Sequence, residues 1–350
     1  MAVSDSFVIF VILCNVSVFA SIEKLTQSKV YSVNLNDTVE ERWKHVMLDY
    51  KDFVSFSHKI ISESVPPFAL PLVEKIAAAV EKYLPWPYAG EIKGIAKALK
   101  MKVGDIVLIN LFYDLTAYCT SIVAEDETGK LWHARNLDFD FHQILHELTI
   151  YVNFMQNGKI LYSGVTFAGY IGLLTGQRPH SFTITVDERD KGSGWLNYLI
   201  GIFDSNVVPV SFLVRNVLER DTTFTRAVSS LSNTDTAADA YFIVAGVRAG
   251  EGAVITKARL QVDDVWYLNQ TNNKWFLVET NYDHWIPTPA SDKRRDAAIQ
   301  SMRSMGRGHI NTKNLFKVLS TPPVLQSSTI YSVVMSAADP QIFTTWLRGY

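Results

Sequence analysis

The chain has 350 residues, a length that fits one large layered domain or two to three smaller domains. Hydrophobic residues make up 48% and charged residues 19%, so the composition excludes a disordered chain and allows a sizeable core. Thirty-three Lys and Arg against 35 Asp and Glu leave a net charge of −2, and this lack of basic excess argues against a nucleic-acid partner.

The N-terminus carries an apolar run from Phe7 to Ala20 that is too short to span a bilayer. It ends in Val18-Phe19-Ala20, a small-x-small pattern that suits signal peptidase, although the preceding residues include Asp5 and no Lys or Arg. We therefore expect residues 1–20 to be a secretory signal peptide, cleaved before Ser21.

Two N-glycosylation sequons, beginning at Asn36 and Asn269, agree with a luminal route. The only cysteines in the sequence are Cys14 and Cys119. Because Cys14 lies in the expected signal peptide, the mature chain would hold a single thiol and no disulfide. A secreted protein that keeps one thiol needs a reason for it.

The hundred residues after the signal peptide are expected to be largely helical, behind one short strand at Val30–Leu35. Thr38 to Glu41 matches a capping box, and it would open a helix whose apolar stripe runs from Trp43 to Ile61. Further helices are expected at Leu72–Leu84, Glu91–Met101 and Asp105–Tyr118.

From Cys119 onward the pattern changes to strands, and Asn157-Gly158 is the strongest short hairpin signal in the chain. We expect strands at Cys119–Glu125, Lys130–Leu137, Leu148–Gln156, Lys159–Phe167, Phe182–Val186, Tyr241–Val247, Ala253–Ala258, Val265–Leu268, Trp275–Glu279, Thr329–Ser336 and Ile342–Arg348. Helices are expected at Gly194–Phe203, Val210–Glu219, Phe224–Leu231, Ser291–Met305 and Thr312–Leu319. Antiparallel hairpins with helix pairs between them predict an α+β domain of two sheets covered by helices.

The familiar catalytic and cofactor motifs are missing: the sequence contains no G-x-S-x-G, Walker A, H-E-x-x-H or dinucleotide fingerprint. His142 and His146 have the i, i+4 spacing of a helical zinc site. They lie in a polar stretch between strands without a cluster of further ligands, so surface histidines are the favoured interpretation. We expect no metal and no cofactor.

Cys119 has two interpretations. It could be a small buried hydrophobe, as cysteines without disulfides often are. Alternatively, a hairpin turning near Thr128 would fold Arg135 and Asp138 back beside Cys119. An arginine there would lower the pKa of the thiol, and a carboxylate could orient the group that takes its proton.

Several separated segments resemble the N-terminal-nucleophile amidohydrolases of the acid ceramidase and N-acylethanolamine acid amidase group. They lie in the same order as in that family and span nearly the whole mature chain. The segments are Cys119–Asp126, His133–Asp138, Phe167–Gly176, Asp187–Gly192, Glu251–Thr256 and Glu279–Trp285.

The resemblance implies an αββα sandwich and a precursor that cuts itself between Tyr118 and Cys119. A helical α-subunit, 21–118, and a catalytic β-subunit, 119–350, would then stay together. The freed Cys119 would carry both the nucleophilic thiol and an α-amine, and the amine could serve as base or form an ammonium–thiolate pair.

The resemblance also implies roles for the other site residues. Arg135 would contact the substrate, Asp138 would accept from the α-amine, and Asn281 would donate to the oxyanion. Glu188 would assist self-cleavage and position Arg135. Taken singly, these residues have other interpretations: Arg135 and Asp138 could form a structural ion pair, Glu188 and its neighbour a solvated turn, and Asn281 a turn.

The resemblance implies a lysosomal enzyme. Within the family it favours hydrolysis of fatty acyl ethanolamides over ceramide hydrolysis, because acid ceramidase joins its two chains by a disulfide and the mature chain here has only Cys119. Asp140, where we expect an uncharged residue, is a departure from the family pattern. The alternatives are ceramide hydrolysis, a thiol-dependent acylase for small polar amides, or a luminal lipid-binding protein without activity. Pro-rich apolar segments at Val65–Leu72 and Tyr83–Tyr88 are candidates for contact with a membrane or micelle surface, or for helix packing in the core.

Overall fold

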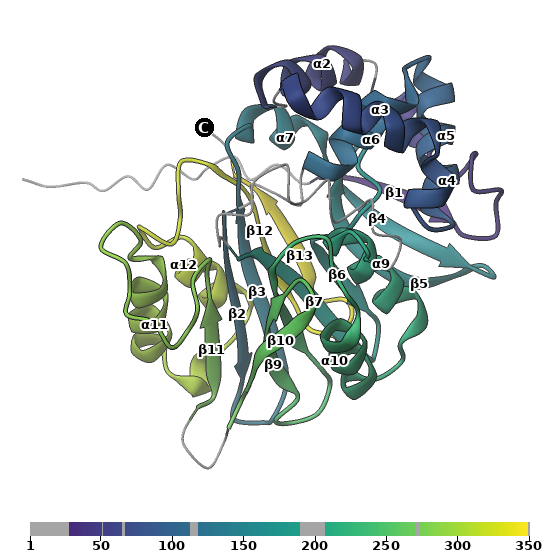
Figure 1. Cartoon of the computed structure of the whole chain (residues 1–350). Helices are drawn as coiled ribbons and strands as arrows, with labels where there is room; N and C mark the ends of the chain where they lie inside the picture. Colours follow the sequence, from purple (N-terminus) through teal and green to yellow (C-terminus); the bar gives the residue numbers. More distant parts are fainter. Residues whose placement is uncertain are drawn as a thin grey trace, which may run out of the picture.

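Two stacked β-sheets form the centre of the structure, a computed structural model that describes residues 28–50, 52–64, 67–112, 118–189, 207–269 and 274–348 (Figure 1). The eight-stranded sheet has the order β1 (Lys29–Asn34), β4 (Thr149–Gln156), β5 (Lys159–Phe167), β6 (Thr175–Arg178), β7 (Phe182–Glu188), β8 (Ala240–Ala245), β9 (Gly252–Ala258) and β10 (Gln261–Tyr267). The five-stranded sheet has the order β11 (Phe276–Glu279), β2 (Tyr118–Glu125), β3 (Leu131–Asp138), β12 (Thr329–Met335) and β13 (Phe343–Leu347).

Helices cover the outer faces of both sheets, which confirms the expected α+β sandwich. On the eight-stranded sheet lie α9 (Val210–Arg220) and α10 (Phe224–Asn233), and on the five-stranded sheet α11 (Arg294–Met305) and α12 (Thr312–Leu319). The N-terminal helices gather beside β1 and β4 (Figure 1). They are α1 (Lys44–Leu48), α2 (Phe53–Ser64), α3 (Leu70–Ala78), α4 (Val80–Tyr83), α5 (Tyr88–Leu99) and α6 (Val103–Phe112), and α7 (His142–Leu148) follows β3.

The alternation of side chains along β2 explains why this strand lies at the centre. Ile122 and Ala124 pack with Met302 and Leu315 of the covering helices. Val123, on the opposite face, packs with residues of β8 and β9 between the sheets. Both faces of the strand are therefore buried, which accounts for the unbroken apolar run Ile122–Ala124.

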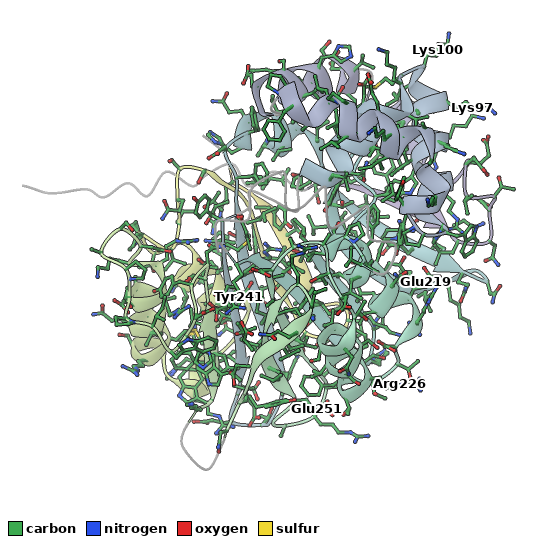
Figure 2. The ribbon with its side chains drawn as sticks, in the orientation of Figure 1. Lys97, Lys100, Glu219, Arg226, Tyr241 and Glu251 are labelled. Carbon is green, nitrogen blue, oxygen red and sulfur yellow. The ribbon has the colours of Figure 1, made fainter. Side chains whose placement is uncertain are left out.

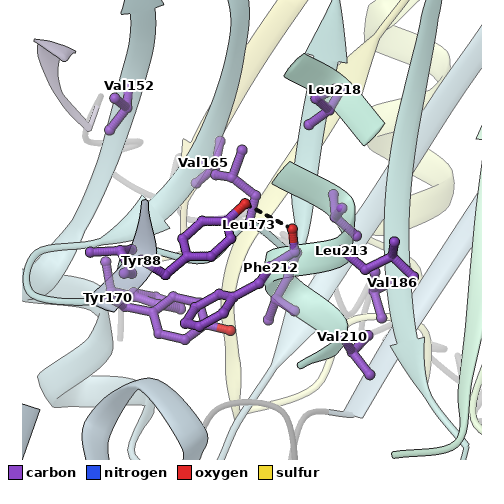
Figure 3. Packing of buried hydrophobic residues seen from close by; sticks show 14 of the residues in the cluster. Tyr88, Val152, Val165, Tyr170, Leu173, Val186, Val210, Phe212, Leu213 and Leu218 are labelled. Atoms are coloured by element: carbon purple, nitrogen blue, oxygen red, sulfur yellow. Dashed lines mark hydrogen bonds between the residues drawn. The ribbon is translucent and has the colours of Figure 1, made fainter. Parts of the chain in front are cut away.

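The N-terminal segment is built into the sandwich. Its strand β1 pairs in parallel with β4 and forms the edge of the eight-stranded sheet. The ring of Tyr88 stacks on Phe212 of α9 with ring centroids 4.2 Å apart, and its hydroxyl donates to the Phe212 carbonyl at 3.0 Å (Figure 3). Charged side chains such as Lys97 and Arg226 point outward instead (Figure 2).

The predicted hairpin at Asn157-Gly158 is confirmed. Both residues have positive φ, 51° and 75°, and they join β4 to β5. A two-residue turn with two positive φ angles suits Asn-Gly because its twist matches that of the flanking strands.

Several expected element boundaries were wrong. The helix expected from Trp43 to Ile61 is two helices, α1 and α2, and Thr38 lies in turns rather than capping a helix. The apolar stripe remains buried, because two short helices meet the core as well as one long helix does. The last N-terminal helix is described from Val103 to Phe112, residues 113–117 fall outside the described ranges, and Tyr118 begins β2.

The polar strand β6 was not predicted, since Thr175–Arg178 has no apolar alternation. The polar stretch containing His142 and His146 is the helix α7. The helix expected at 194–203 falls outside the described residues. Within the described ranges, no helix is long and apolar enough to cross a membrane.

Candidate active site

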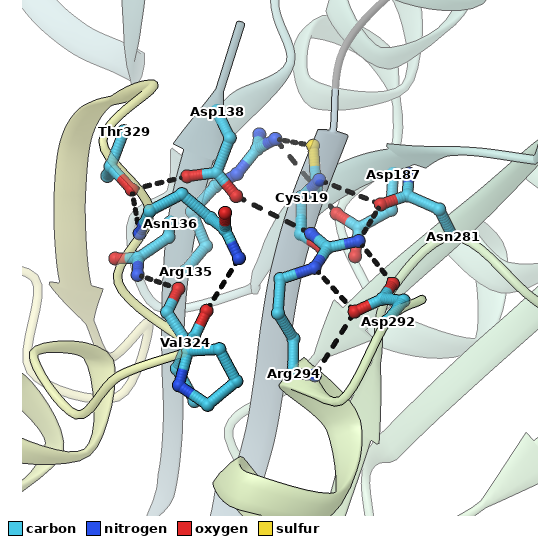
Figure 4. A network of polar contacts seen from close by, with 12 residues as sticks. Cys119, Arg135, Asn136, Asp138, Asp187, Asn281, Asp292, Arg294, Val324 and Thr329 are labelled. Atoms are coloured by element: carbon cyan, nitrogen blue, oxygen red, sulfur yellow. Dashed lines mark hydrogen bonds and ion pairs between the residues drawn. The ribbon is translucent and has the colours of Figure 1, made fainter. Parts of the chain in front are cut away.

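Strand pairing places Arg135 beside Cys119. In the antiparallel pair β2–β3, Ser121 lies opposite Arg135 and Cys119 opposite Leu137. Opposite residues share a face of the sheet, and so do residues two apart in one strand, so Arg135 is the diagonal neighbour of Cys119. Its Nη2 donates to the Cys119 Sγ at 2.7 Å (Figure 4).

The guanidinium of Arg135 is fixed from several sides. Nη1 donates to the carbonyl oxygen of Leu174 at 2.6 Å and to the hydroxyl of Thr175 at 2.7 Å, and Nη2 also donates to the carbonyl of Val186 at 3.1 Å. The side chain is fully buried. Arg135 is thus a pre-positioned, dehydrated positive charge beside the thiol, where electrostatic interactions are strong.

The thiol itself is fully buried, and Sγ donates to the Val186 carbonyl at 3.6 Å. Burial raises the pKa of Cys119 far above its ordinary value. Arg135 acts in the opposite direction, while the charges of Asp187 and Asp138 add to the increase. In the uncut chain the thiol is therefore neutral.

Asp138 lies at the end of β3, near the start of β2. Its Oδ1 accepts from the Thr329 hydroxyl at 2.5 Å, and its Oδ2 accepts from Arg294 at 3.4 Å. Burial raises the pKa of Asp138 to about 6, although Thr329 and Arg294 oppose the increase. The alternative of a structural Arg135–Asp138 pair is not supported, because the ion pairs join Asp138 to Arg294 and Arg135 to Asp187.

Asn281 bridges the backbone of Cys119 and that of Glu188. Its Oδ1 accepts from the Cys119 amide at 3.0 Å, and its Nδ2 donates to the Glu188 carbonyl at 2.8 Å. The Asn281 side chain is therefore close to the reacting residue. Glu188 ends β7, and strand alternation points its side chain to the face opposite that of Asp187.

The interpretation of Glu188-Arg189 as a solvated turn was wrong. Arg189 is buried and donates to both carboxylate oxygens of Asp283, at 2.7 and 2.9 Å, and to Asp263 at 2.6 Å. These contacts tie the loop after β7 to the loop that carries Asn281.

Arg294 is a site residue that the sequence did not reveal. Its Nη1 donates to the carbonyl oxygen of Cys119 at 2.7 Å, and its Nη2 donates to Asn281 Oδ1 at 2.8 Å (Figure 4). The guanidinium also lies 5.9 Å from the ring centroid of Tyr118. In sequence, Asp292 to Asp296 looks like a solvated helix start, so only the folded chain identifies it.

Asp187 was also missed as a site residue, although a signal existed. It is fully buried, lies 4.0 Å from Arg135 and accepts from the Ser121 hydroxyl at 2.7 Å. Polar residues at every second position of β7, Thr183, Thr185 and Asp187, break the usual apolar pattern of a buried strand.

The remaining predicted residues lie at the surface or near it. Tyr118, on the expected cut, is half exposed. Asn36 is exposed, and its side chain bonds the turn at Asn157, while Asn269 is half-buried. His142 and His146 are half-buried on α7, and the described residues hold no group of three or more His, Cys, Asp or Glu side chains suited to a metal.

Comparison with known proteins identifies the family. Residues 119–319 match the linear amide C–N hydrolases of the choloylglycine hydrolase family, and residues 26–84 match the beta subunit of N-acylethanolamine-hydrolyzing acid amidase. The model described as a beta subunit thus matches part of the N-terminal segment, for which we expect a separate helical subunit.

Relatives and a solved structure agree with these matches. The chain is 44% identical to the N-acylethanolamine-hydrolyzing acid amidase of Mus musculus over 91% of this chain and 89% of the relative. It is 35% identical to the acid ceramidase of Homo sapiens over 91% and 85%. A solved N-acylethanolamine-hydrolyzing acid amidase ortholog of Caenorhabditis elegans is 42% identical with a TM-score of 0.61, covering 66% of this chain and 100% of that chain. With its buried thiol and these similarities, the chain is an amide hydrolase and belongs to the linear amide C–N hydrolases of the choloylglycine hydrolase family.

Proposed function

We propose that the chain hydrolyses N-acylethanolamines to fatty acid and ethanolamine, with Cys119 as the nucleophile. The observation that carries this proposal is the position of Cys119, with Arg135 at its sulfur and Asn281 at its nitrogen. The substrate class comes from relatives with 44% and 37% identity whose names give this activity.

The proposal includes maturation by cleavage between Tyr118 and Cys119. The match to the hydrolase family begins at Cys119. The solved relative covers 66% of this chain, and residues 119–350 make up about the same share of it. In the uncut chain the Cys119 nitrogen is an amide that donates to Asn281 and cannot accept a proton. Cleavage would convert it to an amine with an ordinary pKa of about 7.7–8.0, able to take the thiol proton.

In the mature site, the thiolate would attack the carbonyl carbon of the substrate amide. Asn281 and the charge of Arg135 would stabilise the oxyanion of the tetrahedral intermediate. When the C–N bond breaks, the Cys119 ammonium would give its proton to the leaving ethanolamine nitrogen. Water would then hydrolyse the acyl thioester, release the fatty acid and restore the thiol. Asp138 would orient the α-amine, and Glu188 would assist the self-cleavage.

The proposed location is the lysosomal lumen, reached through the signal peptide at residues 1–20, with glycans at Asn36 and Asn269. Contact with a membrane or micelle surface is supported by exposed apolar side chains in the predicted segments. Phe68 is 56% and Trp86 is 67% exposed. Such side chains can insert at a lipid interface.

The maturation is tested by N-terminal sequencing of the larger fragment after incubation in acid. We expect two chains held without a covalent bond, the larger beginning at Cys119, and an uncut, inactive Cys119→Ala variant. A single chain with full activity would contradict the proposal. Uncut protein that binds fatty amides without turnover would instead support a lipid-binding protein.

Ceramide is the second candidate substrate, because the chain is also 35% identical to human acid ceramidase. Competition between a saturated N-acylethanolamine and a ceramide in mixed micelles at about pH 5, where His is mostly charged, gives the ratio of their kcat/KM values. We expect the ethanolamide to be preferred, because ethanolamine needs only a small polar pocket. A preference for ceramide would reverse the assignment, and turnover of short polar amides alone would favour the acylase alternative.

A further inference from the structure

A buried carboxyl group, that of Asp187, faces the thiol and the guanidinium from the opposite sheet. Asp187 lies in β7, while Cys119 and Arg135 lie in β2 and β3, so the three side chains meet between the sheets. All three are fully buried. Asp187 Oδ1 is 4.0 Å from Arg135 Nη2, the nitrogen that also donates to Cys119 Sγ.

The two oxygens of Asp187 have different surroundings. Oδ1 accepts from the Ser121 hydroxyl, which in turn accepts from Thr185 at 2.8 Å. Thr185 continues to the ring of His133 at 2.9 Å. Oδ2 is buried and has no hydrogen-bond partner among the described residues. A buried carboxylate with one unsatisfied oxygen costs more free energy than a neutral carboxyl at the same place, because burying an unpaired charge is costlier than burying an unpaired hydroxyl.

The charges near the thiol lead to the same conclusion. Arg135 supplies one positive charge, which can balance one neighbouring anion. An ionised Asp187 neutralises Arg135 and raises the pKa of Cys119, so carboxylate and thiolate compete for the same guanidinium. A neutral Asp187 leaves Arg135 to the thiolate.

We propose that Asp187 is a positioning residue that acts in its neutral form, leaving Arg135 to stabilise the Cys119 thiolate, and that its ionisation sets the upper pH limit of the site. This inference rests on the proposed function, in which Cys119 is the nucleophile. It would explain, from residues of this chain, why an enzyme proposed for the lysosomal lumen works at acidic pH.

The ionisation behaviour of the surrounding groups agrees with this role. Burial raises the pKa of Asp187 to about 7, although Arg135 and Ser121 oppose the increase. The titratable or charged groups around Asp187 are Cys119 on β2, His133, Arg135 and Asp138 on β3, Tyr241 on β8, Glu279 on β11, Arg294 on α11 and Tyr331 on β12. Only Asp138 and Glu279, with pKa values raised by burial to about 6 and about 8, titrate in the same range as Asp187. A variant is therefore needed to assign the pH limit.

The test is Asp187→Asn, which has nearly the shape of the neutral acid and cannot ionise. In the cut protein, where the Cys119 amine can take the thiol proton, the ultraviolet absorbance of the thiolate reports on Cys119, with Cys119→Ser as the blank. We expect the acid dissociation constant of the Cys119 thiol to be about tenfold larger in the variant, so that the pKa of the thiol is about one unit lower. We also expect the ratio of kcat/KM at about pH 8 to that at about pH 5 to rise about tenfold or more.

Ser121→Ala is the second variant, and it guards against misfolding of the first. Losing the hydroxyl donor raises the pKa of Asp187 further, so the alkaline limb of the pH profile should move to higher pH. An unchanged alkaline limb and thiol titration in either folded variant would overturn the inference. The thiol titration needs no substrate, so it separates failure of this inference from failure of the proposed substrate assignment.

Discussion

Arg294 holds the carbonyl oxygen of Cys119 at 2.7 Å, although the two residues are 175 positions apart in the chain. The same guanidinium contacts Asn281 and Asp138 and is itself held by Asp292 at 2.6 Å. One side chain at the start of α11 thus joins the strand that begins with the nucleophile to the other polar groups of the site.

Replacing Arg294 with Ala should slow both cleavage and turnover about 100-fold, because a displacement of the reacting groups by about 1 Å has an effect of this size. The measurement is the rate of fragment formation on gels together with kcat of the fully cut protein. Arg303→Ala is the matched control, since Arg303 is exposed on the same helix. Equal effects of the two variants would contradict a role for Arg294.

Asn281→Ala should lower kcat more than it changes KM, because an oxyanion donor acts chiefly in the transition state. A loss of about 2.7–4 kcal/mol is typical when such a donor is removed. Asn281→Asp separates the two functions of the side chain, since it keeps the acceptor for the Cys119 amide and loses the donor. If only KM rises, Asn281 is a substrate-binding or structural residue.

A buried ion cluster joins the N-terminal segment to α9. Both carboxylate oxygens of Glu91 accept from Arg215, at 2.6 and 2.8 Å, and they also accept from Arg42 at 2.9 Å and Trp43 at 2.6 Å. Burial favours the protonated acid, but Arg215 and the hydrogen bonds outweigh it and hold the pKa of Glu91 below its ordinary value. Because this pKa is depressed, the contribution of Glu91 to stability is fully present above about pH 4.3 and is lost as the pH falls through the folded-state value.

Glu91→Gln should therefore lower the free energy of unfolding by about 3–5 kcal/mol at about pH 5, because it leaves two arginines buried beside a neutral group. Urea unfolding of the uncut Cys119→Ala chain measures the loss. Glu74→Gln, at an exposed position of α3, is the control and should change stability by less than about 0.5 kcal/mol. In the cut protein, Glu91→Gln should also let the two fragments separate more readily. A loss no larger than that of the control would show that the cluster does not join the segments.

Overall stability should fall as the pH rises from about 6.5 to about 8, a range above the titration of buried His133, whose lowered pKa makes stability rise with pH only below about 6.5. Burial raises the pKa values of three acids, Asp138 to about 6, Asp187 to about 7 and Glu279 to about 8. An acid with a raised pKa contributes stability that is fully present below its unfolded pKa of about 4 and is lost as the pH rises through the folded value. Each tenfold difference in proton affinity between the folded and unfolded chain contributes at most about 1.4 kcal/mol. Calorimetry of uncut Cys119→Ala at several pH values between about 6.5 and about 8 checks this, and a melting temperature that increases with pH in that range would contradict it.

The sequence by itself determined the strands around Cys119 and the proximity of Cys119 and Arg135. Both follow from local rules: side chains alternate along a strand, and a short turn fixes which residues of a hairpin lie opposite one another. The order of the family motifs along the chain likewise pointed to the amide hydrolases, and the Asn157-Gly158 turn required only the φ preferences of two residues.

Only the tertiary structure decided which charges complete the site. Arg294 and Glu91 look like ordinary surface residues in sequence, because nothing local distinguishes a solvated charge from one that will be paired across the fold. Arg294 bonds Cys119 across 175 positions of the chain, and Glu91 bonds Arg42 across 49 and Arg215 across 124. Burying a charge is unfavourable unless an oppositely charged or hydrogen-bonding partner lies beside it. These partners come from other parts of the sandwich, so the packing of its layers decides that these residues are buried, and the sequence pattern within one layer does not.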